Sequence, residues 1–197
     1  MKLGVLALQG DVPEHLRTVG GLVPPGSVVA VRHPADLEAL DALFLPGGES
    51  TTIARLLHGA NLWNPLAKRL ADGFAVLGTC AGLILLAREL APAAAGPDPP
   101  TFGTLDVRVR RNDYGTQHES FEGPVTVDGV TGRPFPGVFI RSPRILSVGP
   151  GAQPVAWRGE EIVGVRSGSV WGLAFHPELS DDLRVHRRFL SGAGLKV

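Results

Sequence analysis

The sequence predicts an α/β protein in which a central, mostly parallel sheet is covered by helices on both faces. Two observations support this fold class. Over residues 1–90, short apolar runs alternate with longer segments of helical periodicity, and strands that alternate with helices build parallel sheets. From residue 105 onward the pattern changes to short pieces with period two, which predicts an added region of antiparallel strands in the second half.

The first half supplies the parallel strands and their helices. Each strand is predicted from a short apolar run, and these runs are residues 1–8, 27–32, 42–45 and 74–77. Helices are predicted from Pro13 onward, from residue 53 onward, over residues 62–70 and over residues 83–90. The last of these consists of strong helix formers, so we expect a helix directly after the fourth strand.

The second half begins after a connection rich in proline and alanine, residues 91–100. Residues 105–110 alternate apolar and polar side chains, and strand-like pieces recur at 125–127, 138–140, 155–157 and 162–165. We expect these strands to attach to the first sheet. A last apolar run, residues 170–175, precedes a final helix that reaches residue 190, and we expect residues 1–197 to form a single domain.

Composition excludes several classes of function. With 44% hydrophobic residues the chain can bury a substantial core, and 19 basic residues balance 19 acidic ones. A neutral chain has no net field that would draw it to nucleic acid or to an anionic membrane. No apolar run is long enough for a membrane span, so we expect a cytoplasmic protein. The single cysteine excludes an internal disulfide, and no Cys/His cluster has metal-ligand spacing.

That single cysteine, Cys80, is the first candidate for chemistry. It lies between a predicted strand and a predicted helix, in the sequence Gly78-Thr79-Cys80-Ala81-Gly82. A nucleophile on such a turn is exposed above the sheet edge, and glycines on either side relieve the crowding of strained dihedral angles. A position at a helix N-terminus also favours thiolate over thiol. The alternative is a free cysteine that packs as a small hydrophobic residue.

His176 is the candidate for the base that Cys80 needs. It ends the last apolar run and is followed by Pro177 and Glu178. In an extended segment residues i and i+2 point the same way, so Glu178 could accept the other imidazole N–H and orient the ring. Strand ends of a parallel sheet meet at one edge, which brings Cys80 and His176 together as parts of a Cys-His-Glu triad. The alternative is a turn that merely leads into the final helix.

The other histidines considered as partners of Cys80 have no positioned helper in their own segments. The helical patterns around His15 and His186 predict solvated side chains, whereas His58 lies near a helix end and His33 lies in a turn.

Chemistry at a carbonyl also needs donors for the negative oxygen that forms during attack. Two loops could supply them: the Ala81 N–H, directly after the nucleophile, and an N–H of Gly47-Gly48 after the third strand. Glycines allow the backbone to approach the reacting atoms closely, although a Gly-Gly pair is also common in plain turns.

Three motifs together resemble the class I glutamine amidotransferases, a family with a catalytic triad. They are Pro46-Gly47-Gly48-Glu49-Ser50, Gly78-Thr79-Cys80-Ala81-Gly82 and Phe175-His176-Pro177-Glu178. Within that family the chain is most similar to the glutaminase subunits of pyridoxal 5′-phosphate synthases. The motifs that carry this narrower resemblance are Leu8-Gln9-Gly10-Asp11 with Glu14-His15, Glu49-Ser50-Thr51-Thr52, Arg111-Asn112 with Gln117 and Glu119-Ser120-Phe121, and Phe139-Ile140-Arg141-Ser142-Pro143.

The resemblance implies a three-layer, flavodoxin-like fold and a reaction. In this family pattern Cys80 attacks the side-chain amide of L-glutamine, and His176, oriented by Glu178, protonates the departing ammonia. The remaining implied roles are substrate binding by Gly48, Glu49, Ser50, Arg111, Ile140 and Arg141, and an oxyanion hole made by the backbone of Gly48 and Ala81. No cofactor and no metal are implied.

The residues alone do not select Arg111. Arg108, Arg110 and Arg111 lie close together in an alternating strand, where any of them could be a solvated surface charge. An arginine can pair with an α-carboxylate in a bidentate fork, and only the resemblance points to Arg111. Tyr114, Thr116 and Ser142 depart from the family pattern, and the proline-rich segment 92–100 receives no function.

The resemblance also implies a partner, the synthase subunit that uses the ammonia, and a sluggish chain when that subunit is absent. Docking is expected to complete the oxyanion hole. The nearest alternative is the glutaminase subunit of imidazole glycerol phosphate synthase. A catalytically silent docking module of the same fold is a second alternative, and a thiol sensor would need a resolving cysteine that this chain lacks.

Overall fold

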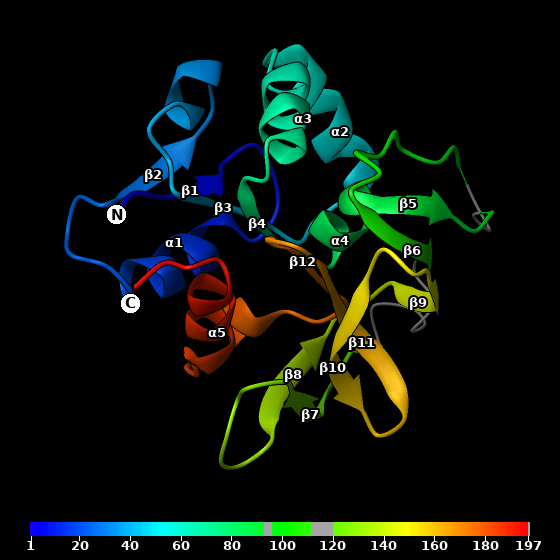
Figure 1. Ribbon diagram of the computed structural model, residues 1–197. Coiled ribbons are helices and arrows are strands. Elements are labelled where there is room, and N and C mark those ends of the chain that lie inside the picture. The colour runs from blue at the N-terminus through cyan, green and yellow to red at the C-terminus, as the bar shows by residue number, and fades with distance from the viewer. Residues whose placement is uncertain (93–95, 112–119, 197) are drawn as a thin grey trace.

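The computed structural model describes residues 1–92, 96–111 and 120–196, and its centre is a sheet of nine strands in the order β2-β1-β3-β4-β12-β11-β10-β7-β8 (Figure 1). The parallel part consists of β2 (Val28–Val31), β1 (Leu3–Leu6), β3 (Ala42–Leu45), β4 (Ala75–Thr79) and β12 (Val170–Leu173). The order 2-1-3-4 followed by the last parallel strand is that of flavodoxin-like, doubly wound sheets, which confirms the predicted fold class.

Helices cover both faces of the parallel strands, as predicted. They are α1 (Val12–Gly20), α2 (Ser50–Gly59), α3 (Trp63–Ala71), α4 (Ala81–Leu86) and α5 (Arg184–Gly192). In Figure 1, α1 and α5 lie on one side of the sheet, and α2 and α3 lie on the other. No helix of the described residues is long and apolar enough to cross a membrane.

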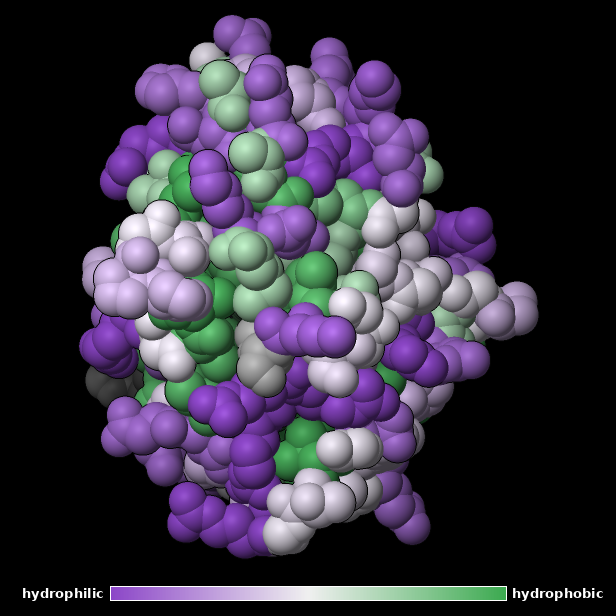
Figure 2. Space-filling model, turned by 60° about the vertical axis from the view of Figure 1, so that its left-hand side comes forward, coloured by the Kyte–Doolittle hydropathy of each residue, from purple (hydrophilic) through white to green (hydrophobic). Residues whose placement is uncertain are grey.

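The core lies between these layers. The fully buried side chains of Phe44 and Trp171, from two strands, pack against Phe189 of α5. Among the described residues, the large hydrophobic side chains that are exposed are Met1 and Leu56. Figure 2 shows the face turned toward the N-terminal strands, where hydrophilic side chains dominate the upper and lower parts. The apolar content of the sequence is therefore largely used for packing.

The second half adds antiparallel strands, as predicted. β11 (Glu161–Ser167) pairs antiparallel with β12, and the sheet continues through β10 (Gln153–Arg158), β7 (Phe121–Val127) and β8 (Phe135–Phe139). Residues 105–110 do not join this sheet. They form β6 (Leu105–Arg110) of a separate three-stranded sheet, between β5 (Ala87–Leu90) and β9 (Arg144–Val148).

The helix predicted over residues 83–90 is wrong in its second half. α4 ends at Leu86, and the next four residues form β5, which pairs parallel with β6 through Ala87↔Leu105 and Leu90↔Val109. These residues are good helix formers, but β6 offers them a row of backbone partners. Tertiary pairing overrides intrinsic helix propensity here.

Candidate active site

Cys80 occupies a strained turn between β4 and α4. Its backbone has φ +48° and ψ −100°, outside the regions that non-glycine residues prefer. The turn is held by a hydrogen bond from the Cys80 N–H to the Leu173 carbonyl of β12, at 2.8 Å. A Cβ added at Gly82 would lie 2.4 Å from the Leu45 carbonyl oxygen, and one at Gly78 would lie 2.6 Å from the Gly82 backbone. The predicted glycine bracket is therefore a packing requirement.

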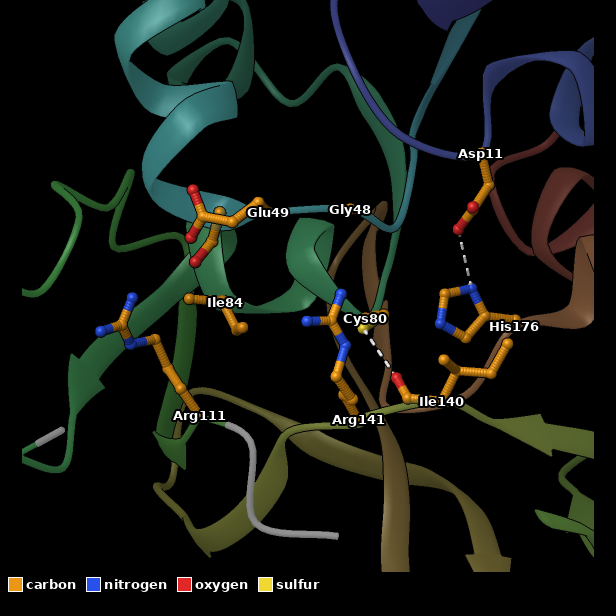
Figure 3. Close-up of a pocket in the computed structure, with 10 residues that line it drawn as sticks. Asp11, Gly48, Glu49, Cys80, Ile84, Arg111, Ile140, Arg141 and His176 are labelled. Atoms are coloured by element: carbon orange, nitrogen blue, oxygen red, sulfur yellow. Dashed lines mark hydrogen bonds and ion pairs between the residues drawn. The ribbon is translucent and has the colours of Figure 1, made fainter. Parts of the chain in front are cut away.

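Most of the residues predicted to form the site line one pocket (Figure 3). From the prediction these are Gly48, Glu49, Ser50, Cys80, Arg111, Ile140, Arg141 and His176. In Figure 3, His176 lies on one side of Cys80, and Glu49 and Arg111 lie on the other. Glu178 is fully buried and contacts His176 Nδ1, and Ala81, the first residue of α4, is fully buried and follows Cys80 in the chain. The pocket is thus built from segments that are far apart in the chain.

His176 and Glu178 are in direct contact. The imidazole Nδ1 lies 2.7 Å from Glu178 Oε1, and both side chains are almost inaccessible to solvent. The local geometry differs from the prediction, because residues Pro177–Leu179 form a 3-10 turn and not an extended segment. The turn folds the carboxylate back under the imidazole, so the predicted contact forms by another route.

The pKa values of this pair are strongly perturbed. Burial alone would raise the pKa of Glu178, but His15 and His176 hold it far below its usual range. Burial alone would lower the pKa of His176, whereas Asp11, Cys80 and Glu178 raise it well above the ordinary value. An ionised carboxylate only accepts hydrogen bonds, so Nδ1 of His176 is the donor and Nε2 remains for the nucleophile.

The prediction that His15 and His186 are solvated is wrong. Both side chains are completely buried, and Nε2 of His15 lies 3.3 Å from Glu178 Oε1. α1 turns its His15, Thr18 and Val19 side chains inward. These three positions share one face of the helix, the face that packs inward against the sheet.

Asp11 borders the site, although the sequence analysis quoted it only within a family motif and gave it no role. It lies between β1 and α1, lines the pocket, and places Oδ2 at 3.2 Å from Nδ1 of His176. The available signal was its position in the loop between the first strand and the first helix, on the same sheet edge as Cys80 and His176.

The Gly47-Gly48 loop packs directly against the histidine. A Cβ at Gly47 would lie 2.3 Å from Cε1 of His176, and Gly48 has φ +149°. The Gly47 carbonyl accepts the Asp11 N–H at 3.2 Å, and Gln9 Oε1 accepts the Glu49 N–H at 2.9 Å. Because the peptide is trans, the Gly48 N–H points away from the Gly47 carbonyl and hence away from α1.

Glu49 and Arg111 are held by neighbours on the far side of the pocket. The Glu49 carboxylate caps α2 by accepting the N–H groups of Thr51 and Thr52. The Arg111 guanidinium lies 3.3 Å from Asp98 Oδ1 and donates to the Pro97 carbonyl at 3.3 Å. The proline-rich segment, which received no function from the sequence, therefore contacts the predicted substrate-binding arginine.

Several predicted family positions lie outside the described residues: Asn112, Tyr114, Thr116, Gln117 and Glu119. The third departure from the family pattern, Ser142, is completely buried next to Arg141, whose backbone has φ +44°.

Comparison with known proteins agrees with this geometry. The family model described as the SNO glutamine amidotransferase family matches residues 5–193. The "Pyridoxal 5'-phosphate synthase subunit PdxT" of Pyrococcus furiosus is 47% identical over 96% of this chain and 98% of its own length. The protein of the same name from Deinococcus radiodurans is 48% identical, with 98% of both chains covered.

A solved structure described as "Crystal structure of glutamine amidotransferase" superposes with a TM-score of 0.89 at 43% identity, covering 99% of this chain and 100% of that one. A family model that matches nearly the whole sequence, together with this structural likeness, identifies the relatives of the chain. The protein belongs to the SNO glutamine amidotransferase family.

Proposed function

We propose that this chain is the glutaminase subunit of a pyridoxal 5′-phosphate synthase, acting as one domain over residues 1–197. It hydrolyses L-glutamine to L-glutamate and ammonia and passes the ammonia to the synthase subunit. The observation that carries this proposal is the pocket around Cys80, which His176 borders on one side and Arg111 on the other. The relatives named as subunits of pyridoxal 5′-phosphate synthase support the choice of pathway.

The first chemical step is attack of Cys80 Sγ on the side-chain carbonyl carbon of glutamine, with the proton of the thiol passed to Nε2 of His176. The oxygen takes up negative charge, and the N–H groups of Gly48 and Ala81 would receive it. The Ala81 N–H belongs to the first turn of α4, where N–H groups have no intrahelical acceptor. The C–N bond then breaks, and the nitrogen leaves as ammonia with a proton from Nε2 of His176.

The second step releases glutamate. Water attacks the thioester while His176 Nε2 takes up its proton, the C–S bond breaks, and Cys80 is restored. Glu178 keeps Nδ1 protonated and the imidazole oriented throughout, as expected for the third member of a triad. The raised pKa of His176 suits the proton-donating step, because the imidazole then holds its proton at neutral pH.

Substrate orientation follows from the charges at the far end of the pocket. Arg111 is the cation assigned to the glutamine α-carboxylate, and Ile140 and Arg141 form the wall next to Cys80. A carboxylate paired with a guanidinium makes strong, directional hydrogen bonds. Binding of the α-carboxylate at one end of the pocket leaves the side-chain amide of glutamine within reach of Cys80 Sγ.

The partner is required because free ammonia is protonated in neutral water and would be lost. We expect the subunits to meet in the cytoplasm, where the thiol of Cys80 stays reduced. The test is a glutaminase assay of the purified chain with and without a pyridoxal 5′-phosphate synthase subunit, in which glutamate and pyridoxal phosphate are measured together. Faster glutamate release with the synthase supports the proposal, and equal rates would sink it.

The silent docking module is tested by labelling. A glutamine-analogue electrophile should modify Cys80 covalently, and a Cys80→Ser variant should resist modification. Wild-type chain that stays unlabelled in the presence of the synthase subunit would favour the silent module over the glutaminase.

A further inference from the structure

His15 is a buried histidine that is not part of the triad. It contacts a residue next to the proposed nucleophile and the residue that orients the proposed base. Nε2 of His15 lies 3.3 Å from Glu178 Oε1 and 3.1 Å from the Thr79 hydroxyl. Thr79 directly precedes Cys80, and Glu178 holds His176. One imidazole nitrogen from α1 therefore contacts the neighbour of the nucleophile and the carboxylate that orients the base.

The position of the proton on His15 follows from its partner. Glu178 is ionised and can only accept, so Nε2 of His15 must be the donor. The same carboxylate oxygen accepts Nδ1–H of His176 at 2.7 Å. Two imidazole nitrogens from different parts of the chain thus approach one oxygen atom, at 2.7 Å and 3.3 Å.

The other oxygen of this carboxylate shows why the second donor matters. Oε2 of Glu178 is buried and has no hydrogen-bond partner among the described residues. Without His15, the buried carboxylate would keep only the hydrogen bond with His176 among the described residues. If the Glu178 carboxylate rotated, Oε1 would move. The imidazole of His176 would turn with it, because breaking a hydrogen bond to a buried carboxylate is costly.

We propose that His15 is a positioning residue of the glutaminase site: the contact of its Nε2 with Oε1 of Glu178 holds the carboxylate in the orientation that aims His176 at Cys80. This inference rests on the proposed glutaminase function. His15 itself does not line the pocket and touches neither substrate nor the reacting atoms. Its effect is expected on turnover and not on glutamine binding.

The chain offers a matched control for packing. His186 is as completely buried as His15, and Phe44 neighbours both, with ring centroids 6.4 Å from His15 and 5.9 Å from His186. The ring nitrogens of His186 have no hydrogen-bond partner among the described residues. Leucine has about the same volume as histidine, so both replacements keep the packing similar, but only His15→Leu removes an N–H group that lies against Glu178.

The experiment measures kcat and KM for glutamine hydrolysis in the complex with the synthase subunit, at about pH 8. His15→Leu is expected to lower kcat by about 10- to 100-fold, with KM changed by less than about twofold. His15→Gln places an amide donor near the position of Nε2 and should restore most of the lost kcat. His186→Leu should keep kcat within about twofold of wild type. An unchanged kcat in His15→Leu, or an equal loss in His186→Leu, overturns the proposal.

A second measurement does not depend on activity. The Nδ1 proton of His176, held by Glu178, should give a downfield proton resonance in the full-length chain that disappears in His176→Gln. We expect this resonance to shift or broaden in His15→Leu and to stay in place in His186→Leu. An unchanged resonance in folded His15→Leu overturns the positioning role, whereas wild-type complex that releases no glutamate overturns the glutaminase proposal and leaves this measurement valid.

Discussion

Two regions of the molecule handle polar groups in opposite ways. At the carboxyl ends of β1, β3, β4 and β12, the side chains of His15, Thr79, His176 and Glu178 are almost completely buried and contact one another. In the antiparallel strands, the charge of Glu161 is shared between two arginines at the surface. Buried polar groups are costly unless every partner is in place, whereas exposed ion pairs contribute little. The buried polar side chains therefore mark the region where the fold accepts a cost in stability, and this region is the candidate active site.

The largest expected effect comes from removing the proposed nucleophile, Cys80, which tests the functional side of this comparison. Cys80→Ala should abolish glutamate release by the complex, and His176→Ala should lower kcat by about three or more powers of ten, because triad members act as a unit. Glutamate release by the purified complexes is the measurement. Thr126→Ala, at an exposed position of β7, is the control and should keep wild-type turnover. Substantial activity in Cys80→Ala would refute the nucleophile assignment.

The next effect concerns two arginines of one strand segment that differ in burial. Arg111 is largely buried and borders the pocket, whereas Arg108 is exposed and pairs with Glu89. Arg111→Lys should raise KM for glutamine by about 10- to 100-fold, the loss expected for a charge-assisted hydrogen bond. The measurement is KM for glutamine, from steady-state kinetics of Arg111→Lys and Arg108→Lys. An equal rise in KM for Arg108→Lys would remove Arg111 from the substrate site.

A smaller effect concerns stability and pH. Burial lowers the pKa of His186 to about 4. As pH falls from the ordinary histidine value toward this one, the unfolded chain takes up a proton that the folded chain refuses, so the folded state loses stability. His186 contributes at most about 3 kcal/mol to this loss of unfolding free energy, and His186→Leu should abolish that contribution. Urea unfolding at neutral and at acidic pH measures it. The control is His58→Leu, at an exposed position, which should lose as much stability on acidification as the wild type. If His186→Leu also loses as much stability as the wild type, the prediction is wrong.

The smallest effect is expected in the antiparallel region. Glu161→Gln weakens the contacts with Arg144 and Arg158, both 2.7 Å long and both with partly exposed arginines. The free energy of unfolding should fall by about 1 kcal/mol or less, with glutamate release unchanged. Denaturant unfolding with and without salt is the measurement. A loss above about 3 kcal/mol would show that this region also depends on buried charge.

The sequence predicted those parts of the site that have a local signature. The glycines around Cys80 and the strand end at His176 mark positions whose geometry is set within a few residues. Glu178 was predicted by the wrong local geometry, yet the 3-10 turn still brings its carboxylate to Nδ1 of His176. The choice of Arg111 over its neighbours required the family resemblance.

The remaining errors have a common physical origin. His15 looked like a solvated helix residue because its burial depends on how α1 docks against β4 and the turn after β12, and no local pattern records that docking. The residues of β5 looked helical because their partner strand begins more than ten residues later. Tertiary contacts decide both cases, and propensity alone cannot anticipate them.

The place of β12 in the sheet also sets the order in which the protein becomes reactive during its synthesis. β12 is made long after β4, yet it pairs with β4 and receives the hydrogen bond from the Cys80 backbone. Chains leave the ribosome from the N-terminus, and contacts between distant segments form last. A nascent chain therefore carries Cys80 before His176 exists, and the proposed hydrolysis can start only after β12 and His176 have been made.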